Sequence, residues 1–253
     1  MAIGIIPARL GSTRLPKKAL ADIAGKTLIR HVVENAKRCQ SLDRIIVATD
    51  DPEIARQAEL SGVESALTRA DHPSGTDRIA EVAKGLKGEI FINIQGDEPE
   101  IAPATIDSVV KTLENDLELD LATAACQISE LDEYLSPHRV KVVLDQRGNA
   151  LYFSRSPIPH ARSNNTSGHL ELPQGSAVAL GHIGIYGYRK AALERLVSLK
   201  PSPLELCEKL EQLRALQAGM KIGVALVSST APGIDTLADL EAFRTRYQDR
   251  ASG

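Results

Sequence analysis

The sequence predicts an α/β fold with a doubly wound, mostly parallel sheet and a smaller α+β extension. The first half alternates short apolar runs with helical patterns, as βαβ units do. The length of 253 residues exceeds one ordinary domain but falls short of two. Apolar residues make up 43% and charged residues 25%, which excludes disordered, collagen-like and coiled-coil proteins.

Strands and helices are expected in strict alternation through residue 94. The predicted strands are Ile3–Ile6, Arg44–Ala48, Val63–Leu67 and Ile90–Ile94. The predicted helices are Thr27–Cys39, Pro52–Leu60 and Asp77–Leu86. The second has the clearest start, because Asp51 can cap it and proline suits its first position.

The second half is less regular. Strand-like runs are found at Leu121–Ile128, Val140–Leu144, Ala150–Phe153, Ile183–Tyr188 and Ile222–Val227. A helix opening with a capping box at Ser202 is expected to continue to Gly219, and a last helix to cover Thr236–Tyr247. We interpret the polar Arg155–Gly181 stretch as a mobile loop, with closure as a lid one role for it. No linker is evident, so residues 1–253 are expected to form a single domain.

Charge and cysteine usage narrow the class of protein. A net charge of −3 argues against a dedicated nucleic-acid binder. No run approaches the roughly 18 apolar residues of a membrane span, and the N-terminus lacks the pattern of a signal peptide. Three scattered cysteines, Cys39, Cys126 and Cys207, are interpreted as small core residues in a reducing compartment. We therefore expect a cytoplasmic protein.

The segment 7–18, directly after the first strand, concentrates positive charge. It contains four cations and two small residues, namely Arg9, Arg14, Lys17, Lys18, Gly11 and Ser12. Open α/β sheets bind ligands at the carboxyl ends of their strands, and clustered cations suit a triphosphate. The sequence therefore favours a phosphate site here over the alternative of a solvated basic loop.

Two acidic segments are candidates for a magnesium site. Asp97 follows the fourth strand in the run Gln95-Gly96-Asp97, and Asp235 precedes the last helix. A carboxylate at a strand end beside a phosphate loop can hold Mg²⁺. Gln95 can read a base edge. The alternatives are an ordinary turn for Asp97 and a helix N-cap for Asp235.

Two helix segments have both a functional and an ordinary interpretation. Ser74-Gly75-Thr76-Asp77-Arg78 opens a helix as a small-residue turn, which is also how a capped helix begins. Glu208, Glu211 and Gln212 would share one helix face, which is otherwise a solvated surface. The Gly25-Lys26-Thr27 run is no Walker A loop, because Leu20 stands where that motif needs glycine.

Seven segments together resemble one family over essentially the whole chain. They are ARLGSTRLPKK, TRADHPSGTDRI, INIQGDEP, VKVVLDQRGNALYFSRSPIP, GHIGIYGYR, PSPLELCEKLEQLR and GIDTLADLE. In this order they closely resemble the 3-deoxy-manno-octulosonate (KDO) cytidylyltransferases. The resemblance implies a nucleotide-diphospho-sugar transferase-like fold and the magnesium-dependent reaction of CTP with KDO to give CMP-KDO and pyrophosphate. It also implies a homodimer that serves lipopolysaccharide synthesis.

The resemblance also implies a division of labour along the chain. Residues 1–120 would be the nucleotide-binding half, 121–227 a sugar-binding and dimerisation extension, and 228–253 a C-terminal helix returning to the first half.

The implied phosphate ligands are Arg9, Ser12, Arg14 and Lys18. The implied cytosine contacts are Ala8, Leu10, Ser74, Gly75 and Gln95. The implied magnesium carboxylates are Asp97 and Asp235. The implied sugar contacts are Arg78, His182, Tyr186, Glu211 and Gln212, with Arg155 a further candidate for the sugar carboxylate.

Two positions depart from the family pattern. Lys17-Lys18-Ala19 stands where many members have Gly-Lys-Pro, which leaves open which lysine engages phosphate. Gly181 stands where a basic residue often precedes the histidine.

The chemistry that the resemblance implies is an in-line attack of the sugar's anomeric hydroxyl on the α-phosphorus. Arg14, Lys18, Asp97 and Asp235 would carry it by neutralising charge. Two alternatives remain open: a cytidylyltransferase for another acidic sugar (8-amino-KDO or a sialic acid), and a non-catalytic nucleotide-binding protein.

Overall fold

The computed structural model describes residues 1–11, 15–162, 172–173, 175, 178–228 and 232–252. The chain divides into two compact units, Met1–Asp107 with Ala231–Gly253, and Ser108–Thr230. Helix α4 (Pro103–Asn115) passes from the first unit into the second. Sequence analysis places the division of the chain near residue 120, a few residues beyond the end of this helix.

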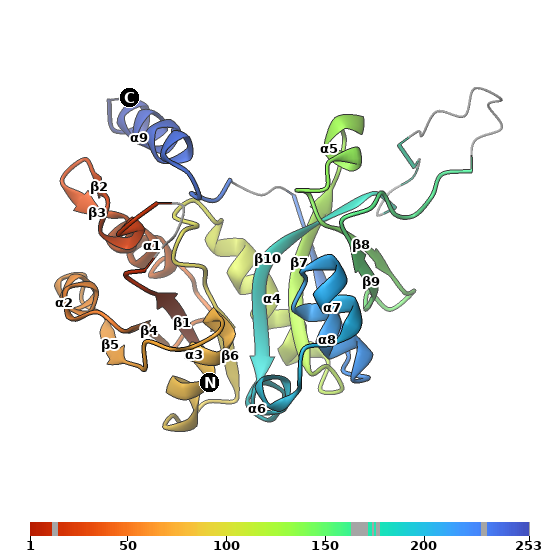
Figure 1. Ribbon diagram of the computed structural model, residues 1–253, viewed down its shortest axis with the longest axis horizontal. Coiled ribbons are helices and arrows are strands. Elements are labelled where there is room, and N and C mark those ends of the chain that lie inside the picture. The colour runs from red at the N-terminus through yellow and green to blue at the C-terminus, as the bar shows by residue number, and fades with distance from the viewer. Residues whose placement is uncertain (12–14, 163–171, 174, 176–177, 229–231, 253) are drawn as a thin grey trace. The chain divides into compact units, whose positions relative to one another are not determined.

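The first unit is built on four parallel strands in the order β6-β1-β4-β5 (Figure 1). Its strands are β1 (Ala2–Ala8), β4 (Arg44–Thr49), β5 (Glu64–Leu67) and β6 (Ile90–Asn93), with the two-residue pair β2 (Asp22–Ile23) and β3 (Lys26–Thr27). Its helices are η1 (Lys18–Leu20), α1 (Leu28–Ala36), α2 (Pro52–Leu60), α3 (Gly75–Lys84) and α9 (Leu237–Ser252). The predicted α/β class with a mostly parallel sheet is confirmed.

Local signals explain why α2 begins and ends where predicted. Asp51 Oδ1 accepts hydrogen bonds from the backbone N–H groups of Glu53 and Ile54 at 2.9 and 3.0 Å. Pro52 occupies the first helical position, where no N–H is needed. Gly62 then takes the left-handed conformation (φ 72°), which few other residues adopt easily.

The core of the first unit covers both faces of β1. Ile3, Ile5 and Ile6 have no exposed surface, as expected for a parallel strand packed on both sides. Helix α9 joins this unit by packing on α1, where the His31 ring meets the Phe243 and Tyr247 rings edge-on, with centroids 5.8 and 4.6 Å apart. The C-terminal segment therefore belongs to the same unit as β1.

The second unit has a mixed sheet in the order β11-β7-β10, in which β11 is parallel and β10 antiparallel to β7. Strand β8 pairs with β10 and β9. Its strands are β7 (Leu121–Gln127), β8 (Lys141–Leu144), β9 (Ala150–Ser154), β10 (Leu180–Arg189) and β11 (Ile222–Val227). Its helices are α5 (Leu131–Leu135), α6 (Lys190–Ser198), α7 (Pro203–Glu208) and α8 (Gln212–Gln217). A bulge interrupts the β10–β7 register between Ile183 and Tyr186.

The single helix predicted from Ser202 to Gly219 is wrong, because the structure has two. The start is as predicted, with a complete capping box between Ser202 and Glu205. Lys209 then adopts a left-handed conformation (φ 55°), which ends α7. Glu208 therefore does not share a helix face with Glu211 and Gln212.

The prediction for the cysteines is only partly correct. The cysteines are not all core residues: Cys126 is buried, but Cys39 is only partly buried and Cys207 is exposed. Helices α4, α5 and α6 were not predicted. Of the Arg155–Gly181 stretch, residues 163–171, 174 and 176–177 lie outside the described residues, so the lid stays a prediction. Over the part of the chain that is described, no helix is both long and apolar enough to span a membrane.

Candidate active site

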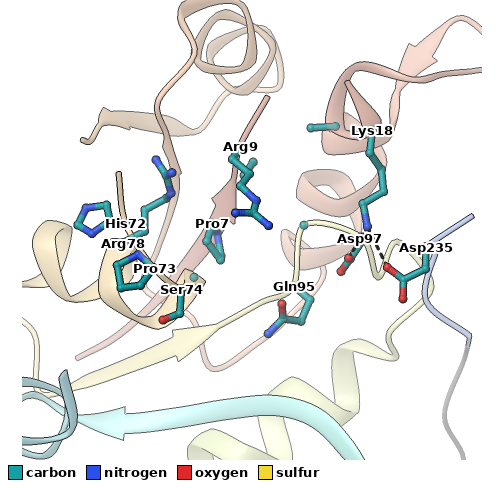
Figure 2. Close-up of a pocket in the computed structure, with 14 residues that line it drawn as sticks. Pro7, Arg9, Lys18, His72, Pro73, Ser74, Arg78, Gln95, Asp97 and Asp235 are labelled. Carbon is teal, nitrogen blue, oxygen red and sulfur yellow. Dashed lines mark hydrogen bonds and ion pairs between the residues drawn. The ribbon is translucent and has the colours of Figure 1, made fainter. Parts of the chain in front are cut away.

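A cavity of about 270 Å³ opens at the carboxyl edge of the first unit's sheet (Figure 2). Its walls come from the end of β1 with Arg9, from the start of α3 and the residues before it, from the segment after β6, from η1, and from Asp235 before α9. Nine residues predicted from the sequence line it: Ala8, Arg9, Lys18, Ser74, Gly75, Arg78, Gln95, Asp97 and Asp235. Sequence analysis missed five others: Pro7, Ala19, His72, Pro73 and Gly96.

The two candidate metal carboxylates meet at one cation. Lys18 Nζ lies 2.6 Å from Asp97 Oδ2 and 3.2 Å from Asp235 Oδ1, as the dashed lines in Figure 2 show. It also donates to the carbonyl of Ile234 at 2.9 Å. The Ile234 N–H donates to the Asp97 carbonyl at 2.8 Å, which holds the two acidic segments together. Residues 138 positions apart in the sequence thus share one charged cluster.

Asp235 is not the cap of the last helix. That role belongs to Thr236 and Asp239, because Thr236 Oγ1 accepts from the Asp239 N–H at 3.2 Å and Asp239 Oδ2 accepts from the Thr236 N–H at 2.8 Å. These reciprocal bonds are a capping box. The alternative interpretation of Asp235 as an N-cap is therefore wrong, and its carboxylate is turned to Lys18.

The acidic cluster carries excess negative charge. Burial, with the charges of Asp97 and Asp235 next, raises the pKa of the Glu98 carboxyl to about 7. No group of three or more potential ligands surrounds a common metal position among the described residues. Two partly exposed carboxylates nevertheless fit Mg²⁺, which is commonly held by one or two carboxylates together with substrate phosphates and water.

Close backbone packing shapes the cavity floor. A Cβ atom on Gly96 would lie 2.8 Å from the Pro7 carbonyl oxygen, so only glycine fits where the β1 and β6 ends converge. Ser74 caps α3 by accepting from the Asp77 N–H at 3.2 Å, as an ordinary capped helix would. In the view of Figure 2, Arg9 and Gln95 lie between this helix start and the Lys18 cluster.

Arg78 is a nearly buried cation of the cavity wall. One of its guanidinium nitrogens, Nη1, hydrogen-bonds the hydroxyl of Thr68 and lies 3.6 Å from Asp50 Oδ1. This separation is longer than a hydrogen bond, so the Asp50 carboxylate attracts the Arg78 guanidinium without hydrogen-bonding it.

The other residues that were predicted to bind the nucleotide have three different outcomes. Leu10 does not line the cavity, and Ser12 and Arg14 lie outside the residues that the structure describes. Of the two candidate lysines, Lys17 is exposed with a left-handed backbone (φ 54°), whereas Lys18 lines the cavity. Lys18 is therefore the lysine that can reach a bound nucleotide here.

Four of the predicted sugar contacts belong to the second unit. The rings of His182 and Tyr186, both on β10, have centroids 5.4 Å apart. Burial, with the Tyr188 and Glu211 charges next, raises the pKa of Tyr186 well above its ordinary value. The Gln212 side chain is buried, and its Nε2 has no hydrogen-bond partner. An orphaned buried donor is costly unless a ligand pairs with it.

Arg155 is occupied by the protein itself. Its Nε donates to the Glu208 carbonyl at 2.7 Å and its Nη1 to the Pro137 carbonyl at 3.0 Å. Lys141, which sequence analysis missed, is fully buried and donates to the carbonyls of Ser136, Arg139 and Arg155 at 2.6–2.8 Å. No sequence signal marks it, because it lies within a strand. Both cations tie together the loops that flank β8 and β9.

A parallel sheet with a charged cavity at its carboxyl edge defines a nucleotide-binding α/β protein. Residues 3–222 match the family model described as cytidylyltransferase. The chain is 46% identical to 3-deoxy-manno-octulosonate cytidylyltransferase of Neisseria gonorrhoeae (strain NCCP11945), covering 96% of this chain and 97% of the relative. It is 45% identical to the Geobacter sulfurreducens protein of the same name, covering 94% and 95%.

Solved structures agree. A structure of CMP:2-keto-3-deoxy-manno-octonic acid synthetase complexed with CTP superposes with a TM-score of 0.89 at 42% identity, covering 98% of this chain and 99% of that one. A 4-diphosphocytidyl-2C-methyl-D-erythritol synthase from Anaerococcus prevotii, at 12% identity and TM-score 0.63 (98% of each chain), shares the fold. The chain belongs to the 3-deoxy-manno-octulosonate cytidylyltransferase family, as its sequence motifs predicted.

Proposed function

We propose that the protein transfers the cytidylyl group of CTP to KDO, forming CMP-KDO and pyrophosphate. The observation that carries the proposal is the cavity of the first unit, where Lys18, Asp97 and Asp235 meet at the sheet edge. A polyanion and a divalent cation can share such a cluster, because a lysine can pair with phosphate and carboxylates can hold the metal. Family membership supports CTP and KDO as the substrates.

Transfer needs positioning and charge neutralisation more than covalent help from the protein. Arg9 and Lys18 would neutralise the phosphates and the departing pyrophosphate. Asp97 and Asp235 would hold Mg²⁺, which when bound supplies further charge neutralisation at the phosphates. The anomeric oxygen of KDO forms the new bond to the α-phosphorus as the bond to the β-phosphate bridging oxygen breaks. The proton of the anomeric hydroxyl passes to solvent.

Base selection belongs to Gln95 and the Ser74-Gly75 turn. The Gln95 amide offers both a donor and an acceptor to cytosine. A site built to pair with one base edge rejects a base that leaves buried polar groups unpaired. We expect strong preference for CTP over UTP in turnover, and equal turnover of the two would remove Gln95 as the base reader.

The sugar contacts assigned to the second unit are His182, Tyr186, Glu211 and Gln212. Arg78 stays a candidate sugar contact on the first unit. The orphaned amide of Gln212 supports a polar ligand in the second unit. Arg155 is better placed to brace its loops than to bind the sugar carboxylate. We also propose that the protein is a cytoplasmic homodimer, and this part of the proposal is supported by family membership.

Pyrophosphate release tests the proposal. The protein is incubated with CTP, Mg²⁺ and one acidic sugar at a time: KDO, 8-amino-KDO or a sialic acid. We expect release with KDO, and none without sugar or after chelation of the metal. Faster pyrophosphate release with 8-amino-KDO or a sialic acid would make that sugar the substrate. No release with any of the three sugars would favour a non-catalytic nucleotide-binding protein.

A further inference from the structure

The hydroxyl of Thr123 lies inside the bulge of β10. Thr123 is fully buried on β7, opposite the point where the β10 register shifts. Its Oγ1 lies 2.7 Å from the Ile185 carbonyl oxygen, 3.2 Å from the Ile183 carbonyl oxygen and 2.9 Å from Nε2 of His182. One hydroxyl thus faces two carbonyls and an imidazole.

Counting protons assigns the direction of these bonds. A threonine hydroxyl has one proton to donate, whereas a carbonyl oxygen can only accept. The proton therefore goes to the Ile185 carbonyl, the shortest contact, and Oγ1 accepts from His182 Nε2–H. The opposite assignment leaves the two oxygens facing each other without a proton in a buried site, which is unfavourable.

A neutral imidazole with its proton on Nε2 has a lone pair on Nδ1. His182 is neutral because burial, with the Arg139 charge second, lowers its pKa to about 3. Its ring is held edge-on to Phe153 at a centroid distance of 5.0 Å, and its backbone carbonyl accepts from Arg139 Nη1 at 3.1 Å. Among the residues that the structure describes, none hydrogen-bonds Nδ1.

We propose that Thr123 is a positioning residue that holds His182 as the Nε2–H tautomer, so that His182 meets the sugar as a hydrogen-bond acceptor at Nδ1. The sugar role of His182 rests on the proposed function, whereas the tautomer does not. An acceptor lone pair selects a hydroxyl donor and repels a carboxylate. His182 therefore recognises a hydroxyl of the sugar acid, and other groups bind its carboxylate.

The first test observes the tautomer directly in the unliganded protein. Imidazole nitrogen shifts are recorded at pH 7 on ¹⁵N-histidine-labelled protein, and loss of one set of signals in His182→Gln assigns residue 182. We expect protonated Nε2 and unprotonated Nδ1. A proton on Nδ1, or on both nitrogens, would overturn the proposal. This result is independent of whether KDO is the substrate.

The second test compares two substitutions at Thr123. Thr123→Val removes the hydroxyl, and Thr123→Ser keeps it. We expect Thr123→Val to raise KM for KDO about tenfold, the value of one hydrogen bond of about 1.4 kcal/mol, with KM for CTP unchanged. Thr123→Ser should restore both KM and the imidazole signals of the wild type.

A merely structural role would affect both substrates or neither. If Thr123→Val leaves KM for KDO and the tautomer unchanged, Thr123 does not position His182. Should Thr123→Val fail to fold, the wild-type spectrum and the Thr123→Ser kinetics still decide. A wild-type protein that releases no pyrophosphate with KDO, yet has the Nε2–H tautomer, would refute the proposed function and keep the tautomer assignment.

Discussion

Asp235 and its neighbour Thr236 have different tasks, although they are adjacent in the chain. Asp235 faces Lys18, whereas Thr236 caps α9. Asp235→Asn should therefore reduce turnover by orders of magnitude, because a neutral amide is a poor ligand for a hard divalent cation. The melting temperature should hardly change. Turnover as a function of Mg²⁺ concentration measures the effect, and added Mg²⁺ should recover part of the rate.

Thr236→Ala is the matched control for Asp235→Asn. Loss of the cap should cost about 1 kcal/mol of stability and leave turnover near the wild-type value. If Asp235→Asn retains near-wild-type turnover at limiting Mg²⁺, the carboxylate does not hold the metal.

The low pKa of His182 predicts a pH dependence of stability. Its pKa falls from the ordinary 6.5 to about 3 in the folded chain, mainly through burial. Between these values the unfolded chain binds a proton at this position and the folded chain does not. Stability should therefore fall as the pH drops below 6.5, by up to about 1.4 kcal/mol per unit.

Denaturation midpoints at pH 7 and pH 5 measure this loss. The difference between the two pH values should be smaller in His182→Gln than in the wild type. The same substitution at the exposed His138 should leave the difference unchanged. Equal pH dependence in wild type and His182→Gln would show that His182 titrates normally in the folded chain.

At the scale of elements, the sequence predicts a helix best where its ends carry their own chemistry. Helix α2 begins at Pro52 after the Asp51 cap, and α7 begins with the Ser202 capping box. The end of α7 could not be predicted, because Lys209 is an ordinary helix former by propensity. Its left-handed backbone (φ 55°) runs against that propensity. For the same reason the apparent common face of Glu208 and Glu211 does not exist.

The break at Lys209 is itself testable. Lys209→Gly should stabilise the protein by about 0.5 to 1 kcal/mol, because glycine adopts the left-handed conformation without steric cost. Lys209→Val should destabilise it. Lys200→Gly is the control, since Lys200 is exposed and is not among the positive-φ residues, so it should gain nothing. Thermal midpoints compare the three. Destabilisation by Lys209→Gly would show that the lysine side chain, and not the backbone angle, holds this turn.

Gly181 shows another limit of sequence analysis. The family resemblance implies a basic residue at this position, but a Cβ at 181 would lie 2.3–2.5 Å from the Arg139 guanidinium. Arg139, which donates to the carbonyls of Gly181 and His182, fills that space from elsewhere in the chain. The sequence alone does not show that Arg139 and Gly181 are neighbours, because the fold brings them together.

At the scale of the whole molecule, the sequence predicted the first unit's cavity well and the second unit less completely. The rule that ligands bind at strand ends places Arg9, Gln95 and Asp97 at one edge of a parallel sheet. No comparable rule covers a mixed sheet, and there the resemblance alone singled out His182 and Gln212. Buried polar groups such as Thr123 and Lys141 carry no local signal, because their partners are backbone carbonyls set by the fold.

The division into two units predicts where each substrate acts. CTP with Mg²⁺ should slow hydrogen exchange in the first unit, at the η1 segment, at 72–78 and at 95–98, which line the cavity. For a ligand that binds only the folded unit, CTP at 100 times its Kd adds about 2.7 kcal/mol, so amides that exchange by opening of this unit should slow about 100-fold. KDO added to the CTP complex should slow exchange around Tyr186 and Gln212. Lys18→Ala should abolish the effect of CTP on the first unit without changing exchange in α5 of the free protein. Protection by CTP confined to the second unit would show that the cavity of the first unit is not the nucleotide site.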